Sequence, residues 1–154
     1  MAQALNTMFQ GCNEVLLQHD AIVDKLMGDA VMAVFGAPII RENHIHQAVE
    51  AAAAIQAKGA QMFPAGWESA CVRIGINSGA AFVGRVGSDD VKDYTAIGDV
   101  VNVAQRLQTE ASPGETLVSE SVYREVSDAY PNAERRVLAL KGRSEPVTAY
   151  ALRL

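Results

Sequence analysis

YTAIGDVVNVAQRL, residues 94–107, is the stretch of this chain that says most about its fold. A small-residue break, Gly98-Asp99, stands directly before a segment of helical periodicity, and Asp99 is a favourable N-cap residue. The pattern therefore predicts an amphipathic helix that starts after Asp99 and packs one face against a core. Its apolar stripe at helical spacing consists of Val100, Val103, Ala104, Leu107 and Ala111.

Two polar residues of this helix have a chemistry of their own. Asn102 and Arg106 are four residues apart, so their side chains are neighbours on the face opposite the apolar stripe. An amide beside a guanidinium, both turned away from the core, suits the binding of a sugar and a phosphate. The competing interpretation is an ordinary solvated helix face.

Two further segments have the pattern of paired strands. IVDKLMGDAVMAVFGAP, residues 22–38, holds two apolar runs that meet at Gly28-Asp29, which is a hairpin signal. VRIGINSGAAFVGRVGS, residues 72–88, holds another apolar pair, broken by Asn77-Ser78-Gly79. We expect strands at residues 22–27 and 30–35, and a second strand pair at residues 72–76 and 81–86.

The remaining periodicity predicts one α+β domain over residues 1–154. Apolar residues at spacings of three and four predict a helix at residues 2–18, and Asn43 can cap another at residues 44–62. Residues 88–93 have the composition of a polar loop. Shorter elements are expected as strands at residues 116–118, 136–140 and 147–152, and as a helix at residues 120–127.

Composition excludes several classes of protein. The net charge of −5 argues against a nucleic-acid or anionic-membrane binder, although a polyphosphate could still bind where cations and a metal converge. No apolar run approaches the roughly 20 residues of a membrane span, so no membrane segment and a cytoplasmic location are expected. The two cysteines, Cys12 and Cys71, form no disulfide pattern and are expected in the core.

Four segments together resemble the catalytic domain of the class III nucleotidyl cyclases, the adenylate and guanylate cyclases. The resemblance runs over residues 5–154 and rests on order and spacing. It implies a ferredoxin-like βαββαβ core with additions, and an enzyme of intracellular signal transduction that forms a cyclic nucleotide and pyrophosphate. The segments are DKLMGD (24–29), GINSGAAFVGRVG (75–87), YTAIGDVVNVAQRL (94–107) and LKGRSEPVTAYAL (140–152).

The resemblance also assigns roles to four residues. Asp29 matches one of the two aspartates that hold Mg²⁺ or Mn²⁺ in a two-metal mechanism. Arg106 matches the arginine that stabilises charge on the α-phosphate, and Asn102 matches the residue that orients the ribose. Lys141 matches the lysine that holds the terminal phosphates.

Two more residues match the positions that read the base. Lys25 only donates hydrogen bonds, which suits adenine N1, and Thr95 can accept one from the adenine 6-amino group. A guanylate cyclase would be expected to have Glu at position 25. The pair therefore favours ATP, and an adenylate cyclase that makes cyclic AMP. Many family members have Asp where this chain has Thr95, and the threonine subset is associated with bicarbonate stimulation, which is an additional hypothesis.

In the family, the active site lies between two subunits. The resemblance thus implies a head-to-tail homodimer with two equivalent sites. Asp29 of one subunit would work with a cluster of the other subunit, formed by Lys25, Thr95, Asn102, Arg106 and Lys141.

The sequence departs from the family at its start. Family members begin with a strand that carries the first metal aspartate in an F-x-D-type motif, and no such strand precedes Leu5 here. We therefore expect one metal carboxylate too few, weak cyclisation by these residues alone, and open strand edges that favour association. The alternative is a non-catalytic cyclase-like module that dimerises or binds nucleotide as a regulator; a third possibility is a guanylate cyclase.

Overall fold

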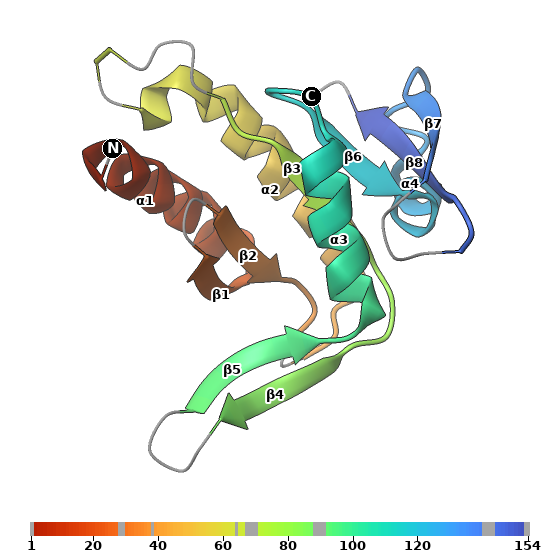
Figure 1. The fold of residues 1–154 in the computed structure, drawn as a ribbon, viewed down its shortest axis with the longest axis horizontal. Helices are drawn as coiled ribbons and strands as arrows, with labels where there is room; N and C mark the ends of the chain where they lie inside the picture. The colour runs from red at the N-terminus through yellow and green to blue at the C-terminus, as the bar shows by residue number, and fades with distance from the viewer. Residues whose placement is uncertain are drawn as a thin grey trace.

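The computed structural model describes residues 2–27, 30–37, 39–63, 65–66, 71–87, 92–139 and 144–152. Within residues 2–5, 24–27, 60, 82–87 and 92–97 it describes the backbone alone. The described residues form a mixed helix and sheet fold, which confirms the α+β class (Figure 1). Its helices are α1 (Ala2–Gln18), α2 (His44–Lys58), a 3₁₀ turn η1 (Gly59–Met62), α3 (Asp99–Glu110) and α4 (Glu120–Val126).

The strands fall into three separate sheets. A four-stranded sheet has the order β3-β6-β8-β7, with β3 parallel to β6 and the other neighbours antiparallel. Two antiparallel hairpins, β1-β2 and β4-β5, make the other sheets. The bounds are β1 (Ile22–Met27), β2 (Ala30–Val34), β3 (Ile74–Ile76), β4 (Phe82–Gly87), β5 (Lys92–Ile97), β6 (Thr116–Ser119), β7 (Glu134–Leu138) and β8 (Val147–Leu152).

Strand β6, inside the four-stranded sheet, is buried on both faces. Successive strand residues point to opposite faces, so adjacent residues of β6 serve different cores. Leu117 packs with Leu107 of α3, whereas Val118 packs with Val122 of α4. All four of these side chains are 0% exposed. β6 is accordingly buried along its whole length, including the polar residues Thr116 and Ser119 at its two ends.

A third core joins α1 to the first hairpin. The apolar face of α1 is buried at Met8, Cys12, Val15 and Leu16, and Cys12 and Val15 pack against Ile55 of α2. Partly buried side chains from both flanking strand regions lie against this same cluster, including Val31 of β2 and Ile74 of β3. The cluster therefore lies beneath two strands that belong to different sheets.

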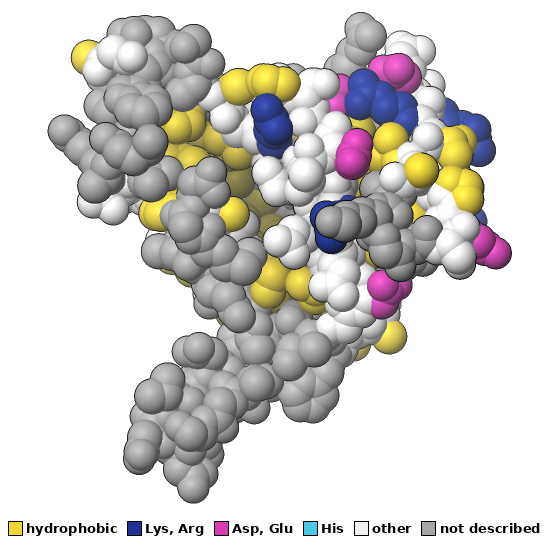
Figure 2. Space-filling model, in the orientation of Figure 1, with side chains coloured by type: hydrophobic (Ala, Val, Ile, Leu, Met, Phe, Trp, Pro, Cys, Tyr) yellow, Lys and Arg dark blue, Asp and Glu magenta, His cyan; other side chains and the backbone are white. Residues whose placement is uncertain are grey.

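No strand bridges β2 and β3 in the part of the chain that the structure describes. Each has a single strand partner there, β1 for β2 and β6 for β3, so their other edges are open. Figure 2 shows hydrophobic side chains lining a hollow on this face of the molecule, on the side of α3 where Figure 1 places β2. The open edges expected from the sequence are thus present.

Several sequence predictions need correction. Residues 72–76 and 81–86 do not pair with each other, because β3 pairs with β6 and β4 pairs with β5. Lys92 and Asp93, predicted as the end of a loop at residues 88–93, belong to β5, a strand that was not predicted because these two charged residues have the composition of a loop; residues 88–91 lie outside the described residues. β7 begins at Glu134 and ends at Leu138, two residues earlier than expected at each end.

Two local predictions, on Cys71 and Asp99, were also wrong, and a third, on Asn43, is confirmed in its position alone. Cys71 is exposed and not part of the core, since it lies in the loop before β3 begins at Ile74. Asp99 is the first residue of α3, and Gly98 occupies the N-cap position. Asn43 stands at the N-cap of α2 as expected, but its side chain makes no capping hydrogen bond.

Candidate functional site

Helix α3 presents Asn102 and Arg106 to solvent. Both side chains are exposed, whereas Val103 and Leu107 on the other face are 6% and 0% exposed. The predicted division of this helix into an apolar and a polar face is therefore confirmed. An exposed amide and guanidinium one turn apart are free to meet a ligand or a second subunit.

Gly98 joins β5 directly to α3. Its backbone has φ +148°, a conformation that L side chains rarely adopt, and its carbonyl accepts hydrogen bonds from the N–H groups of Val101 and Asn102 at 3.1 and 3.4 Å. Because one residue separates the end of β5 from the start of α3, the position of Thr95 on the strand is coupled to that of Asn102 on the helix.

Lys25 and Thr95 are carried by two strands that contact each other, β1 and β5. Lys25 lies opposite Met32 in the β1-β2 pair, and Thr95 lies opposite Gly84 in the β4-β5 pair. The β1-β2 register shifts between Val23 and Lys25. Irregularities of this kind re-aim nearby side chains and are frequent beside active sites.

Asp29 and Lys141 lie outside the described residues. The strands that flank residue 29 are an antiparallel pair with Met27 opposite Ala30. One chain thus brings together β1, β5 and α3, the elements that carry four of the six predicted residues. The two remaining residues stay predictions.

The metal prediction depends on Asp29 alone. In the described ranges, no three His, Cys, Asp or Glu side chains gather as a metal-ligand group would. A carboxylate oxygen is the ligand type that Mg²⁺ and Mn²⁺ prefer, and Mg²⁺ is commonly held by one or two carboxylates together with substrate phosphates. The donor chemistry of Asp29 therefore fits such a metal, provided that a nucleotide completes the site.

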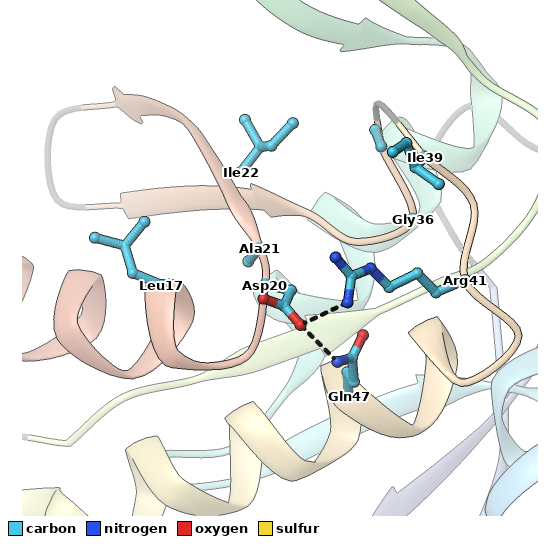
Figure 3. A pocket seen from close by; sticks show the side chains of 9 residues that line it. Leu17, Asp20, Ala21, Ile22, Gly36, Ile39, Arg41 and Gln47 are labelled. Carbon is cyan, nitrogen blue, oxygen red and sulfur yellow. Dashed lines mark hydrogen bonds and ion pairs between the residues drawn. The ribbon is translucent and has the colours of Figure 1, made fainter.

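A pocket of about 330 Å³ lies elsewhere, where the end of α1 meets β1 and the loop before α2 (Figure 3). The Asp20 carboxylate accepts hydrogen bonds there from Arg41 at 3.2 Å and from Gln47 at 3.1 Å. The Arg41 and Asp20 side chains are 56% and 49% exposed, so their ion pair adds little stability. Among the predicted site residues whose side chains the structure describes, neither Asn102 nor Arg106 lines this pocket.

The described helices include none long and apolar enough to cross a membrane. A described ion pair joins Glu115 to Arg136, near β6 and β7, at 2.7 Å. Arg106 is an exposed cation on α3.

Known proteins that are similar to this chain include cyclases. A family model described as the adenylate and guanylate cyclase catalytic domain matches residues 1–153. The chain is 34% identical to adenylate cyclase 1 of Rhizobium meliloti (strain 1021) over 108 residues, which are 68% of the chain and 16% of that protein. It is 27% identical to guanylate cyclase soluble subunit beta-2 of Rattus norvegicus over 150 residues, 96% of the chain and 22% of that protein.

The fold is also similar to that of a solved cyclase structure. The structure of the adenylyl cyclase CyaB from P. aeruginosa matches with a TM-score of 0.84 and 30% identity, over 97% of this chain and 80% of that chain. The chain spans less than a quarter of the two curated relatives above. Since one relative is an adenylate cyclase and another a guanylate cyclase subunit, similarity alone does not choose the nucleotide.

Proposed function

The chain belongs to the family of adenylate and guanylate cyclase catalytic domains, and from the residues of its candidate site we propose that it converts ATP to 3′,5′-cyclic AMP and pyrophosphate. The exposed pair Asn102 and Arg106 on α3 is the observation that carries this proposal. The role belongs to intracellular signal transduction. A cytoplasmic location suits the ATP substrate and the two free cysteines.

The reaction joins the ribose 3′-oxygen to the α-phosphorus and breaks the bond to pyrophosphate. Negative charge grows on the α-phosphate as the new bond forms, and the Arg106 guanidinium neutralises it. Asn102 donates a hydrogen bond to the ribose and holds the 3′-oxygen in line. Catalysis of this kind is mainly positioning and charge stabilisation, which these two side chains supply.

Lys25 and Thr95 select the base in this proposal. Lys25 donates to adenine N1, and Thr95 accepts from the 6-amino group; guanine reverses both requirements. The contact between β1 and β5 supports the assignment, because the two residues must reach one base. A mispaired polar group in such a site costs about 1–3 kcal/mol.

Asp29 would hold the metal ion, Mg²⁺ or Mn²⁺, and Lys141 would hold the terminal phosphates. When bound, the metal neutralises phosphate charge and orients the reacting oxygens. With Asp29 as the one carboxylate assigned to the metal, where the family site uses two, we expect these residues to cyclise ATP slowly.

We place the complete site at the interface of a head-to-tail homodimer. Asn102 and Arg106 point away from the core of their own subunit, as groups that act on a nucleotide shared with a partner must. Asp29 would then come from the other subunit.

The test is a nucleotide turnover assay on the purified chain. ATP or GTP is supplied with Mn²⁺ or Mg²⁺, and cyclic nucleotide and pyrophosphate are quantified by mass spectrometry. We expect slow formation of cyclic AMP that is abolished by chelation and by Arg106→Ala. Equilibrium dialysis with a non-cyclisable ATP analogue measures binding separately.

The other outcomes point to the competing functions. Nucleotide binding without any cyclic product would indicate the non-catalytic regulatory module, which the open edges of β2 and β3 favour. A preference for GTP would indicate a guanylate cyclase and overturn the role of Lys25.

A further inference from the structure

Helix α3 lies against β3 at a point where the strand has no side chain. Gly75 is the middle residue of β3 and pairs with Leu117 of β6. A Cβ atom at position 75 would overlap the carbonyl oxygen of Ala104 and the backbone nitrogen of Gln108, and would come within 3.0 Å of Gln108 Cα. All three atoms belong to the helix backbone, so no side-chain rotation could make room.

A second contact holds the beginning of the same helix. The side-chain amide of Asn77, which follows β3 directly, donates a hydrogen bond to the Val100 carbonyl at 3.1 Å. This bond is partly buried. Residues 75 and 77 therefore touch α3 at its first turn and again one to two turns later.

Along α3, the residues that make these contacts lie on either side of Asn102 and of Arg106. Asn102 lies between Val100 and Ala104, and Arg106 lies between Ala104 and Gln108. A helix held at two points along its axis has its height above the sheet and its tilt fixed. Any change at Gly75 therefore moves Arg106 as part of a rigid body.

We propose that Gly75 and Asn77 are positioning residues that set the height and tilt of α3, and through them the reach of Arg106 and Asn102 toward the nucleotide. The inference rests on the proposed function. A displacement of about 1 Å in a catalytic group can cost about 100-fold in rate. The reaction, as well as the packing, thus requires that α3 lie close to β3.

Burial alone does not require a glycine here. Leu107 and Val103 anchor α3 in the core, and a helix displaced by the width of a methyl group could still bury both. A merely structural role for Gly75 predicts a loss of stability in proportion to crowding. A positioning role predicts a loss of turnover in the protein that remains folded.

Kinetics separate these two roles. Gly75→Ala and Asn77→Ala are compared with Gly11→Ala, where the new Cβ would lie 2.8 Å from the flexible Met62 side chain and away from α3. Val122→Ala, at a fully buried residue of α4, serves as a destabilised control. For Gly75→Ala we expect kcat to fall about 10- to 100-fold, with KM changed less than about threefold.

The decisive comparison uses Arg106→Ala as background. If Gly75 acts mainly through Arg106, adding Gly75→Ala to Arg106→Ala lowers kcat by a smaller factor than adding it to the wild type, because only the positioning of Asn102 is left to lose. An equal loss of kcat on adding Gly75→Ala to the wild type and to Arg106→Ala would overturn the inference. So would a loss of kcat in Val122→Ala as large as that in Gly75→Ala, when the two variants have the same melting temperature. If Gly75→Ala does not fold, the same comparison is made with Asn77→Ala.

A distance measurement tests the seating of α3 without any turnover. Spin labels at Gln105→Cys on α3 and Arg135→Cys on β7, both exposed positions, are placed in a Cys71→Ser background; Cys12 is 4% exposed. Gly75→Ala should lengthen the separation by about 1 Å, and Gly11→Ala should not. An unchanged distance overturns the inference, whereas a wild-type chain that neither binds nor converts ATP overturns the proposed function.

Discussion

Arg136 of β7 and Glu115, the residue before β6, form a two-pronged ion pair. The guanidinium donates from Nη1 to one carboxylate oxygen at 2.7 Å and from Nη2 to the other at 2.8 Å. The side chains are 26% and 18% exposed, so solvent screens this pair less than the others of the described structure. It fastens the edge strand β7 to the turn that leads from α3 into β6.

This pair predicts an acid-dependent loss of stability. The hydrogen bond from Arg136 lowers the pKa of the Glu115 carboxyl from its usual 4.5, while Arg136 stays protonated because Glu115 and Glu134 raise its pKa. The folded state therefore binds the Glu115 proton more weakly than the unfolded state. Its stabilisation is present above about pH 4.5 and is lost as the pH falls through the lower, folded-state pKa.

Glu115→Gln should lower the free energy of unfolding by about 1–2 kcal/mol at pH 7, with a smaller difference below pH 4. Urea unfolding at several pH values measures it. The matched control is Glu134→Gln, whose carboxylate is 60% exposed and bonds the same guanidinium at 2.9 Å; a change below about 0.5 kcal/mol is expected. A difference for Glu115→Gln that is independent of pH would contradict the assignment.

Arg106→Ala should reduce the kcat of ATP cyclisation about 100- to 1,000-fold, because it removes a donor to the charge that develops on the α-phosphate. Its melting temperature should match the wild type, since the side chain is exposed and outside the core. Asn102→Ala should also slow turnover. Gln105→Ala, an exposed neighbour on the same helix, is the control. Equal losses in all three variants would show that the helix face, and not the pair, is sensitive.

Lys25→Glu should move nucleotide preference from ATP toward GTP. A carboxylate accepts from guanine N1–H and cannot donate to adenine N1, so the ratio of ATP to GTP turnover should fall about 5- to 150-fold. Competition between the two nucleotides in one reaction gives this ratio directly. Lys92→Glu, which makes the same charge change at the start of β5, should leave the ratio within about twofold of the wild type. If both variants shift it alike, long-range charge and not base reading is responsible.

The apolar hollow between β2 and β3 should bind a hydrophobic dye such as ANS in the native state. Val31 of β2 is partly buried against the α1 cluster, and a lysine there would place a charge at the open edge. Val31→Lys should therefore weaken dye binding. Val137→Lys, on the edge strand β7 where the side chain is already 55% exposed, should not change it. Folding of both variants is checked by far-ultraviolet circular dichroism.

The helices and the polar face of α3 could be predicted because their signals are local. Periodicity over residues 2–18 gives α1 to the residue, and the spacing of Val103 and Leu107 places Asn102 and Arg106 on the exposed side. The α2 prediction ran on to residue 62 because apolar spacing continues into η1, whereas Gly59 ends the α-helix.

Strand pairing could not be predicted in the same way. β3 pairs in parallel with β6, about 40 residues later in the chain, and no local pattern records such a partner. β5 was missed because Lys92 and Asp93 look like loop residues. Cys71 was misplaced because the strand begins three residues later than its apolar neighbours suggest. The contact of Gly75 with α3 was not predicted, because the role of a glycine within a strand is known only once the helix packed against it is known.

The β4-β5 hairpin extends away from the body of the molecule, with its contacts concentrated on β1 and α3 (Figure 1). Its two strands pair only with each other in the described structure, whereas β6 and β8 each have neighbours on both sides. Amide protons of the hairpin should therefore exchange with solvent through local opening. The free energy of that opening should be well below the free energy needed to expose the amides of β6 and β8. If Thr95 reads the base as proposed, substitutions around it should change which base is accepted with little loss of core stability, so nucleotide choice could diverge among relatives that keep one fold.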